Sequence, residues 1–165
     1  MKKPVLGLAL LFLPITALFA DFNDGAVAYS MGDYQTAYRT MQALAVGSED
    51  EYAQYYLGVM YANGQGIEKD YEEAAKWYRK AAEQGIPQAQ YRLANLYVEG
   101  KGVPQDFEIA YVWYSTAAHQ GHSGAAESVP PAAAMLSPDE LKAAKKLSAE
   151  YIGKYGQKKK KEPSP

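Results

Sequence analysis

Apolar residues recur with helical spacing in the middle of the chain. Ala53, Leu57 and Tyr61 follow one another every four positions, which places them on one stripe of a helix. A second stretch, residues 74–82, has apolar residues at the spacing i, i+3, i+4, i+7 and i+8, which is the pattern of a broad buried helix face. The segment 63–69 between them is polar and contains two glycines that can take positive φ and interrupt both helices. The pattern therefore predicts an antiparallel pair of helices.

The same pattern recurs 36 residues later. When residues 50–85 are aligned with residues 86–121, 16 of the 36 positions are identical. The identities include Trp77 and Trp113, which lie on the alanine-rich face of the second helix in each copy and are expected to be buried. An internal period of this length is typical of stacked helical repeats. We therefore predict an all-α fold, an α-solenoid of antiparallel helix pairs closed by a C-terminal capping helix.

Polar residues and glycines mark the ends of the second helix in each copy. Asp70 and Asp106 occupy the N-cap position, and Glu73 is placed to complete a capping box with Asp70. Gly85 and Gly121 occupy the position at which a left-handed residue ends a helix. We interpret the two aspartates as caps rather than catalytic groups, because both occur at the same position of the repeat.

The flanking segments predict incomplete units and tails. The expected division is a signal peptide over 1–20, a degenerate first helix pair over 21–49, two repeats over 50–121, a partial third repeat and a capping helix over 122–156, and a disordered basic tail over 157–165. Pro130 and Pro131 remove two amide donors within the third repeat, so we expect a break or a sharp kink there. Ser137, Pro138 and Glu140 form a clear start for the closing helix.

The first twenty residues have the parts of a secretory signal. Two lysines precede an apolar run from Val5 to Leu13, and small residues follow before Asp21. The apolar run is shorter than the ~20 residues that a membrane-spanning helix needs. We therefore expect a periplasmic or secreted protein whose mature form begins at or near Asp21.

Charge and composition argue against several classes of function. The formal net charge is −2, and it becomes −4 without residues 1–20, which hold two lysines and no acidic residue. A nucleic-acid partner is not expected, because it would need a clustered basic face. The sequence contains no cysteine, so helix packing has to stabilise the fold without disulfides. We interpret the run Lys158–Lys161 as a solvated tail in preference to a contact with membrane lipid or cell-wall polymer.

The sequence shows no recognisable catalytic, metal or cofactor site. His119 and His122 have no third ligand nearby, and His119 suits the last turn of a helix, so a zinc site is not favoured. The glycine-rich turns at 64–66 and 100–102 follow helices rather than strands, which excludes a dinucleotide-binding loop. We expect no cofactor and no enzymatic activity.

The repeated unit resembles the Sel1-like repeat, a relative of the tetratricopeptide repeat. The resemblance rests on the pattern A-x-x-x-L-G-x-x-Y, G-x-G-x-x-x-D-x-x-x-A and W-Y-x-x-A-A-x-Q-G, which runs from Ala53 to Gly85 and again from Ala89 to Gly121, with Ala94 in place of Gly58. The resemblance implies a right-handed superhelix of helix pairs that binds other proteins, and a concave surface that the first helices line.

A candidate binding surface follows from the resemblance and the helical spacing together. On the first helix of each copy, the positions opposite the buried stripe are expected to form adjacent strips of one partner-binding groove. These positions are Tyr52, Tyr55, Val59 and Asn63 in the first copy and Gln88, Tyr91, Asn95 and Glu99 in the second. The alternative for Tyr55 and Tyr91 is that they recur only because the unit was duplicated, and that they pack between units.

We predict an exported adaptor or scaffold module that binds a protein or peptide partner in this groove. The alternative is a cell-wall-acting enzyme, or an accessory subunit of one, with a carboxylate site that the sequence does not reveal. A convergent acidic cluster inside the groove would favour the enzyme. A groove of tyrosine, asparagine and arginine would favour the binding module.

Overall fold

The computed structural model describes residues 21–157. The expected signal peptide, 1–20, and the lysine run Lys158–Lys161 lie outside this range. Residues 21–157 form helices and no strands: α1 (Phe22–Ser30), α2 (Tyr34–Gly47), α3 (Glu51–Asn63), α4 (Tyr71–Glu83), α5 (Pro87–Glu99), α6 (Phe107–His119), α7 (Ser123–Ala134) and α8 (Pro138–Tyr155). None of the helices in this range is both long enough and apolar enough to span a bilayer.

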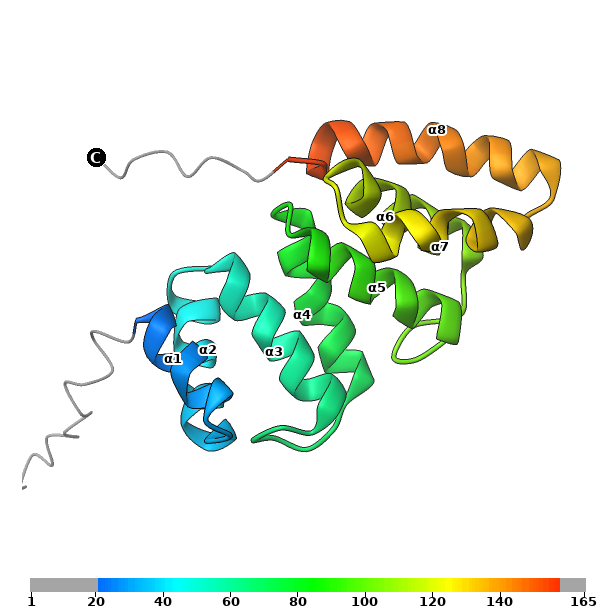
Figure 1. The fold of residues 1–165 in the computed structure, drawn as a ribbon. Coiled ribbons are helices and arrows are strands. Elements are labelled where there is room, and N and C mark those ends of the chain that lie inside the picture. The colour runs from blue at the N-terminus through cyan, green and yellow to red at the C-terminus, as the bar shows by residue number, and fades with distance from the viewer. Residues whose placement is uncertain (1–20, 158–165) are drawn as a thin grey trace, which may run out of the picture.

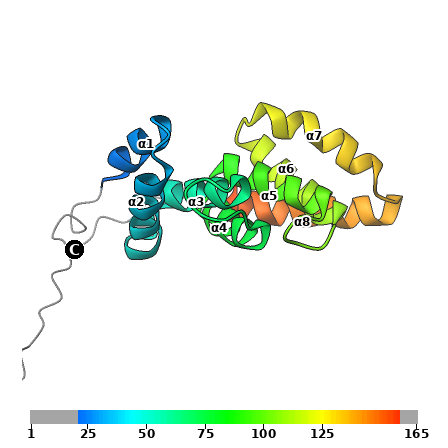
Figure 2. The same cartoon turned by 90° about the horizontal axis from the view of Figure 1, so that it is seen from below.

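The helices stack in the order of the chain. Each helix from α1 to α6 packs against the one that follows it, and α8 turns back to pack on α6 (Figure 1). Figure 2 shows α1 and α7 at the two ends of the molecule, with α3 and α5 between them. The predicted all-α solenoid is confirmed, and the first helices α3, α5 and α7 contact one another in turn.

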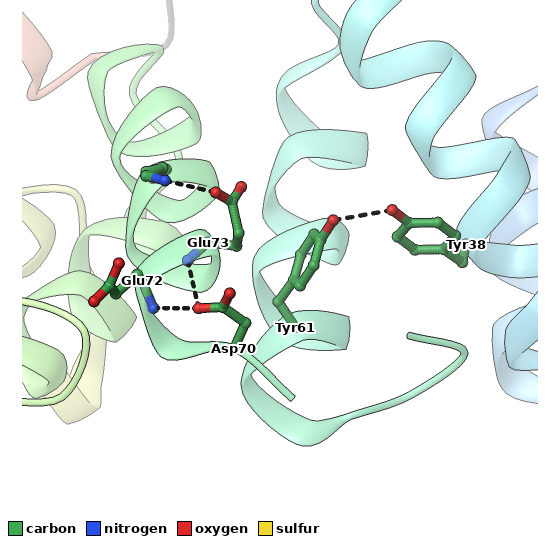
Figure 3. Close-up of polar contacts among 6 residues, drawn as sticks. Tyr38, Tyr61, Asp70, Glu72 and Glu73 are labelled. Carbon is green, nitrogen blue, oxygen red and sulfur yellow. Dashed lines mark hydrogen bonds and ion pairs between the residues drawn. The ribbon is translucent and has the colours of Figure 1, made fainter. Parts of the chain in front are cut away.

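Asp70 caps the start of α4, as the sequence predicts. Its Oδ1 accepts hydrogen bonds from the backbone amides of Glu72 at 2.8 Å and Glu73 at 3.1 Å (Figure 3). The predicted capping box is wrong, because the Glu73 carboxylate pairs with Lys76 Nζ at 2.5 Å. The Asp70 amide donates instead to the carbonyl oxygen of Tyr61 at 3.0 Å, which ties the start of α4 to the end of α3.

The glycine-rich loop of each repeat packs on the helix pair before it (Figure 1). Gly66 has a φ of 75°, and a Cβ at this position would overlap the carbonyl group of Tyr34 at the start of α2. Gly102 has a φ of 68° and lies in the same way against Tyr71 at the start of α4. Gln35 Nε2 donates to the carbonyl oxygen of Gly66 at 3.1 Å. The second glycine of each loop is therefore required by both its backbone conformation and a contact between units.

Glutamines join the two helices of each repeat at the opposite end. Gln84 Nε2 donates to Gln54 Oε1 at 2.9 Å, and Gln120 Nε2 donates to Gln90 Oε1 at 2.9 Å. Gln90 is fully buried and also donates to backbone carbonyls of α4 and α8. A buried amide without partners would be costly, so these pairs explain why the glutamines recur with the period of the repeat.

The two repeat-equivalent tryptophans differ in burial. Trp113 is 3% exposed, and its ring lies 5.0 Å from that of Tyr151 and 5.6 Å from that of Tyr155, both in α8. Trp77 is only partly buried, and Lys80 Nζ lies 4.2 Å from the centre of its ring. The predicted burial is confirmed for Trp113. Trp77 packs on the core near Met41 and Leu57 but is not fully buried, because α8 packs mainly over α6 and only slightly on α4.

α7 is a continuous helix, so the predicted break at Pro130 and Pro131 is wrong. Both prolines are exposed, as are Ala126 and Glu127, the residues whose carbonyls lose their helical donors. Water can therefore satisfy these carbonyls, and the missing hydrogen bonds do not end the helix. α7 and α8 both pack on α6 rather than mainly on each other, so the third helix pair does not close as the first two do.

α8 begins with the predicted start signal. Ser137 Oγ accepts from the Glu140 amide at 3.4 Å, and Glu140 Oε2 accepts from the Ser137 amide at 2.7 Å. Pro138 occupies the first turn, where its missing amide hydrogen is not needed. The helix buries Ala144 and Ser148 and covers the end of the core.

Candidate partner-binding groove

The first helix of each repeat buries one side and presents the other to a shared surface. In α3, Ala53 and Leu57 are fully buried, whereas Tyr52 and Asn63 are exposed. In α5, Leu93 is fully buried, and the predicted groove positions are partly buried or exposed. The division follows from the helical period, because residues three or four apart share a face.

Four of the eight predicted groove residues surround one cavity between α3 and α5. The cavity has a volume of about 190 Å³. It is lined by the predicted residues Val59, Asn63, Asn95 and Glu99, and also by Ala62, Tyr71, Tyr78, Arg92 and Leu96. We call it the polar cavity.

The other four predicted residues lie outside the polar cavity. Tyr52 and Gln88 are exposed. Tyr55 is partly buried and packs its ring against a tyrosine of α4, with the ring centres 6.0 Å apart. Tyr91 is also partly buried and stacks on the imidazole of His122 at 4.6 Å. Tyr91 thus contacts the start of the next helix pair, as the alternative interpretation holds, whereas this contact of Tyr55 lies within its own repeat. The contact of either residue with a partner stays a prediction.

Three of the larger side chains that line the polar cavity are not among the predicted groove residues. Tyr71 and Tyr78 come from α4, the second helix of the repeat, which was assigned to the core. Arg92 comes from α5, and its equivalent in the first copy is Tyr56. This difference between the copies was the available signal, because positions that packing constrains tend to stay alike and contact positions are free to differ.

A second cavity of about 390 Å³ lies one repeat further along the chain. Each of its seven lining residues stands 36 positions after a residue of the polar cavity. The pairs are Ala62 and Val98, Tyr71 and Phe107, Tyr78 and Tyr114, Arg92 and Ser128, Asn95 and Pro131, Leu96 and Ala132, and Glu99 and Met135. We call this one the apolar cavity, because its equivalents of the charged residues are serine and methionine.

Tyr114 joins the two cavities. Its ring lines the apolar cavity, and its hydroxyl donates at 2.6 Å to Asn95 Oδ1, which lines the polar cavity. Burial raises the pKa of the Tyr114 hydroxyl to about 12, and the neighbouring Tyr91 adds to the rise. The phenol therefore stays neutral in the folded protein and can act as the donor in this hydrogen bond.

Comparison with known families explains the duplicated geometry. The family model described as the Sel1 repeat matches residues 51–86 and residues 87–122. The chain carries two Sel1 repeats. Each matched segment contains one helix pair, α3 with α4 and α5 with α6. The two segments contribute every lining residue of the polar cavity, and the second segment contributes one side of the apolar cavity.

Solved structures with Sel1 repeats share the fold. A protective antigen of uropathogenic Escherichia coli with an SLR fold is similar at 32% identity and a TM-score of 0.77, over 82% of this chain and 30% of that one. A Sel1 repeat protein from Oxalobacter formigenes is similar at 29% identity and a TM-score of 0.63, over 79% of this chain and 56% of that one. The chain thus spans less than two thirds of either structure. No curated protein matches it significantly.

The histidines near the second Sel1 repeat have structural positions. His119 is exposed in the last turn of α6, as expected. His122 is the N-cap of α7, and its Nδ1 accepts a hydrogen bond from the Ala125 amide at 3.1 Å. Within residues 21–157, no three histidine, aspartate or glutamate side chains are grouped closely enough to hold a metal ion.

We expect the Sel1 repeats to lose stability at alkaline pH. The unfolded chain ionises the Tyr114 phenol near pH ~10, whereas the folded chain keeps the proton until the pKa of about 12. The contribution of this group to the free energy of unfolding is therefore complete below pH ~10 and is lost as the pH rises towards 12. Urea unfolding at a series of pH values from about 8 to 12 measures the fall.

The control for this prediction is Tyr114→Phe, which has no phenol to ionise. Its free energy of unfolding should fall less than that of the wild type over the same pH range. An equal fall in both proteins would assign the effect to other groups, such as Tyr78, whose pKa burial also raises.

Proposed function

We propose that this protein is an exported interaction module whose concave groove binds a protein or peptide partner. Sel1 repeats generally serve as protein-interaction scaffolds rather than as catalysts. The observation that carries the proposal is the lining of the polar cavity, where tyrosine side chains of α4 meet asparagine and arginine side chains of α3 and α5. Tyrosine and arginine are enriched at protein interfaces, where they account for much of the binding energy.

The acidic residues of the groove do not favour the alternative of a cell-wall-acting enzyme. A carboxylate mechanism would need acidic groups that converge on one point. Glu99 is the one carboxylate among the residues that line the polar cavity, and it forms an ion pair with Lys101 at 2.6 Å. The apolar cavity is lined by no carboxylate. The described groove thus has the character of a binding surface.

The proposed export rests on the first twenty residues of the sequence. Their charged start, apolar run and small-residue end have the order of a cleaved secretory signal. The description of the E. coli neighbour as a protective antigen is in keeping with an exported location for this chain. We place the mature protein in the periplasm or outside the cell.

Site-specific photo-crosslinking in the native host tests the groove. A photoreactive amino acid at Asn63 or Gln88, both exposed on first helices, should crosslink to the same partner protein. The matched control positions are Lys76 and Lys142, which are exposed on second helices. Equal crosslinking from both sets, or none from the groove positions, would contradict the proposal.

The same experiment reports on export. We expect the crosslinked protein in the exported fraction, with an intact mass that corresponds to a chain starting at or near Asp21. An uncleaved product that sediments with membranes would contradict the export while leaving the groove to be judged by its crosslinks.

A further inference from the structure

We propose that the groove binds an extended peptide segment that places a carboxylate in the polar cavity and a large apolar side chain in the apolar cavity. The inference rests on the proposed function and adds the chemistry of the partner. Its basis is the equivalence of the two cavities, which share one buried tyrosine position, Tyr78 in one and Tyr114 in the other, and differ at the rim. Arg92 and Glu99 at the rim of one correspond to Ser128 and Met135 at the rim of the other.

The polar cavity carries a surplus of positive charge. Arg92 forms no ion pair within the part of the chain that the structure describes, whereas Glu99 is already paired with Lys101. The ammonium groups of Lys101 and Lys69 lie 5.4 Å and 5.3 Å from the centre of the Tyr71 ring, which lines the cavity. Arg92 is therefore the one charged residue of the cavity lining that has no ion-pair partner in the described part of the chain. An arginine in this position can bind a carboxylate through two parallel hydrogen bonds.

The apolar cavity suits a side chain without polar groups. Its rim is formed by Phe107, Pro131 and Met135, and Met135 is 59% exposed. Ser128, one of its polar residues, donates its hydroxyl hydrogen to the carbonyl of Gly124 at 2.8 Å. An apolar cavity of ~150 Å³ binds benzene, so a volume of about 390 Å³ can hold the side chain of leucine or phenylalanine.

The spacing of the repeats sets the spacing of the two side chains. The first helices α5 and α7 are in contact, and packed helices lie roughly 8–10 Å apart. An extended peptide advances ~3.3 Å per residue, and its side chains return to the same face at every second residue. The acidic and apolar residues of the peptide should therefore be two or four positions apart. The hydrogen bond between Tyr114 and Asn95 joins the two cavities, so one peptide can reach both.

A panel of synthetic peptides tests the inference. The probes are fluorescein-labelled peptides of about twelve residues with a polar, uncharged background, one glutamate and one leucine, in both orders and at separations from one to six positions. Fluorescence anisotropy with the mature protein should show the tightest binding at separations of two or four. Exchange of the glutamate for glutamine, or of the leucine for serine, should weaken binding about tenfold.

Variants of the protein assign each side chain to its cavity. Arg92→Gln should weaken the glutamate peptide about tenfold and leave the matched glutamine peptide unchanged. Met135→Gln should weaken the leucine peptide and leave the matched serine peptide unchanged. Arg39→Gln, which removes an exposed arginine of α2 outside both cavities, is the matched control and should bind every peptide as the wild type does. Circular dichroism melts confirm that each variant is folded.

The outcomes separate this inference from the proposed function. Binding without a preference for glutamate or for separation, unchanged affinity in Arg92→Gln, or no binding by any peptide would overturn the inference. If Asn63 and Gln88 still crosslink to a partner, the interaction module stands and its partner has another chemistry. If those crosslinks are also absent, both proposals fall.

Discussion

Replacement of Trp113 by alanine should lower the free energy of unfolding by about 3–5 kcal/mol, which is the range for truncation of a large buried aromatic residue. The ring is 3% exposed and fills the space between α6 and the two tyrosines of α8. Its loss leaves a cavity that α8 cannot fill without moving. Urea unfolding followed by circular dichroism measures the change.

Trp77→Ala is the matched control, because Trp77 occupies the equivalent position of the first repeat. Its ring is partly exposed and is covered on one side by Lys80. We expect a loss of about 1 kcal/mol, which is typical of a substitution outside the fully buried core. Equal losses in the two variants would show that the cover by α8 adds nothing to the burial of Trp113.

Gly102→Ala should cost about 3 kcal/mol, from two sources that add. A residue with a Cβ at a φ of 68° costs about 1–2 kcal/mol, and forced overpacking costs about 1–3 kcal/mol. The new Cβ would lie 2.6 Å from the backbone amide nitrogen of Glu72 and would also overlap the carbonyl group of Tyr71. Backbone atoms cannot move aside as a flexible side chain can, so the contact between the two repeats has to open.

Gly121→Ala separates the two contributions. Gly121 has a φ of 85°, and no atom lies within 4 Å of the position that its Cβ would take. This variant should lose only the conformational part, about 1–2 kcal/mol. If Gly102→Ala loses no more than Gly121→Ala in thermal or urea unfolding, the close approach of the loop to α4 does not contribute to stability.

The candidate site was predictable in part. Val59, Asn63, Asn95 and Glu99 follow from the helical period, because the side opposite a buried stripe must face away from the core, together with the resemblance to the Sel1-like repeat. Arg92 lies on the flank of α5, between its outward side and its buried stripe. The sequence does not show which neighbouring helix lies next to this flank. The apolar cavity could not be placed at all, because it requires α7 to continue through Pro130 and Pro131.

The sequence by itself determined the elements with short-range causes. The helix pairs, their period of 36 residues, the aspartate cap at Asp70 and the capping box at Ser137 each depend on residues a few positions apart or on a duplication visible in the chain. These interactions form in the same way wherever the segment lies in the fold. The sequence of the segment is therefore enough to predict these helices and caps.

The tertiary structure decided what depends on residues far apart in the chain. Trp113 is fully buried and Trp77 is only partly buried, because α8 folds back over α6. Gly102 must be glycine partly because its loop touches the preceding repeat. The two cavities are lined by equivalent positions of the repeat but differ in charge. The difference arises because the rim of each cavity comes from the first helix of the next unit, α5 for one and α7 for the other. Such contacts join segments that no local pattern relates, and only the packing of the helices brings them together.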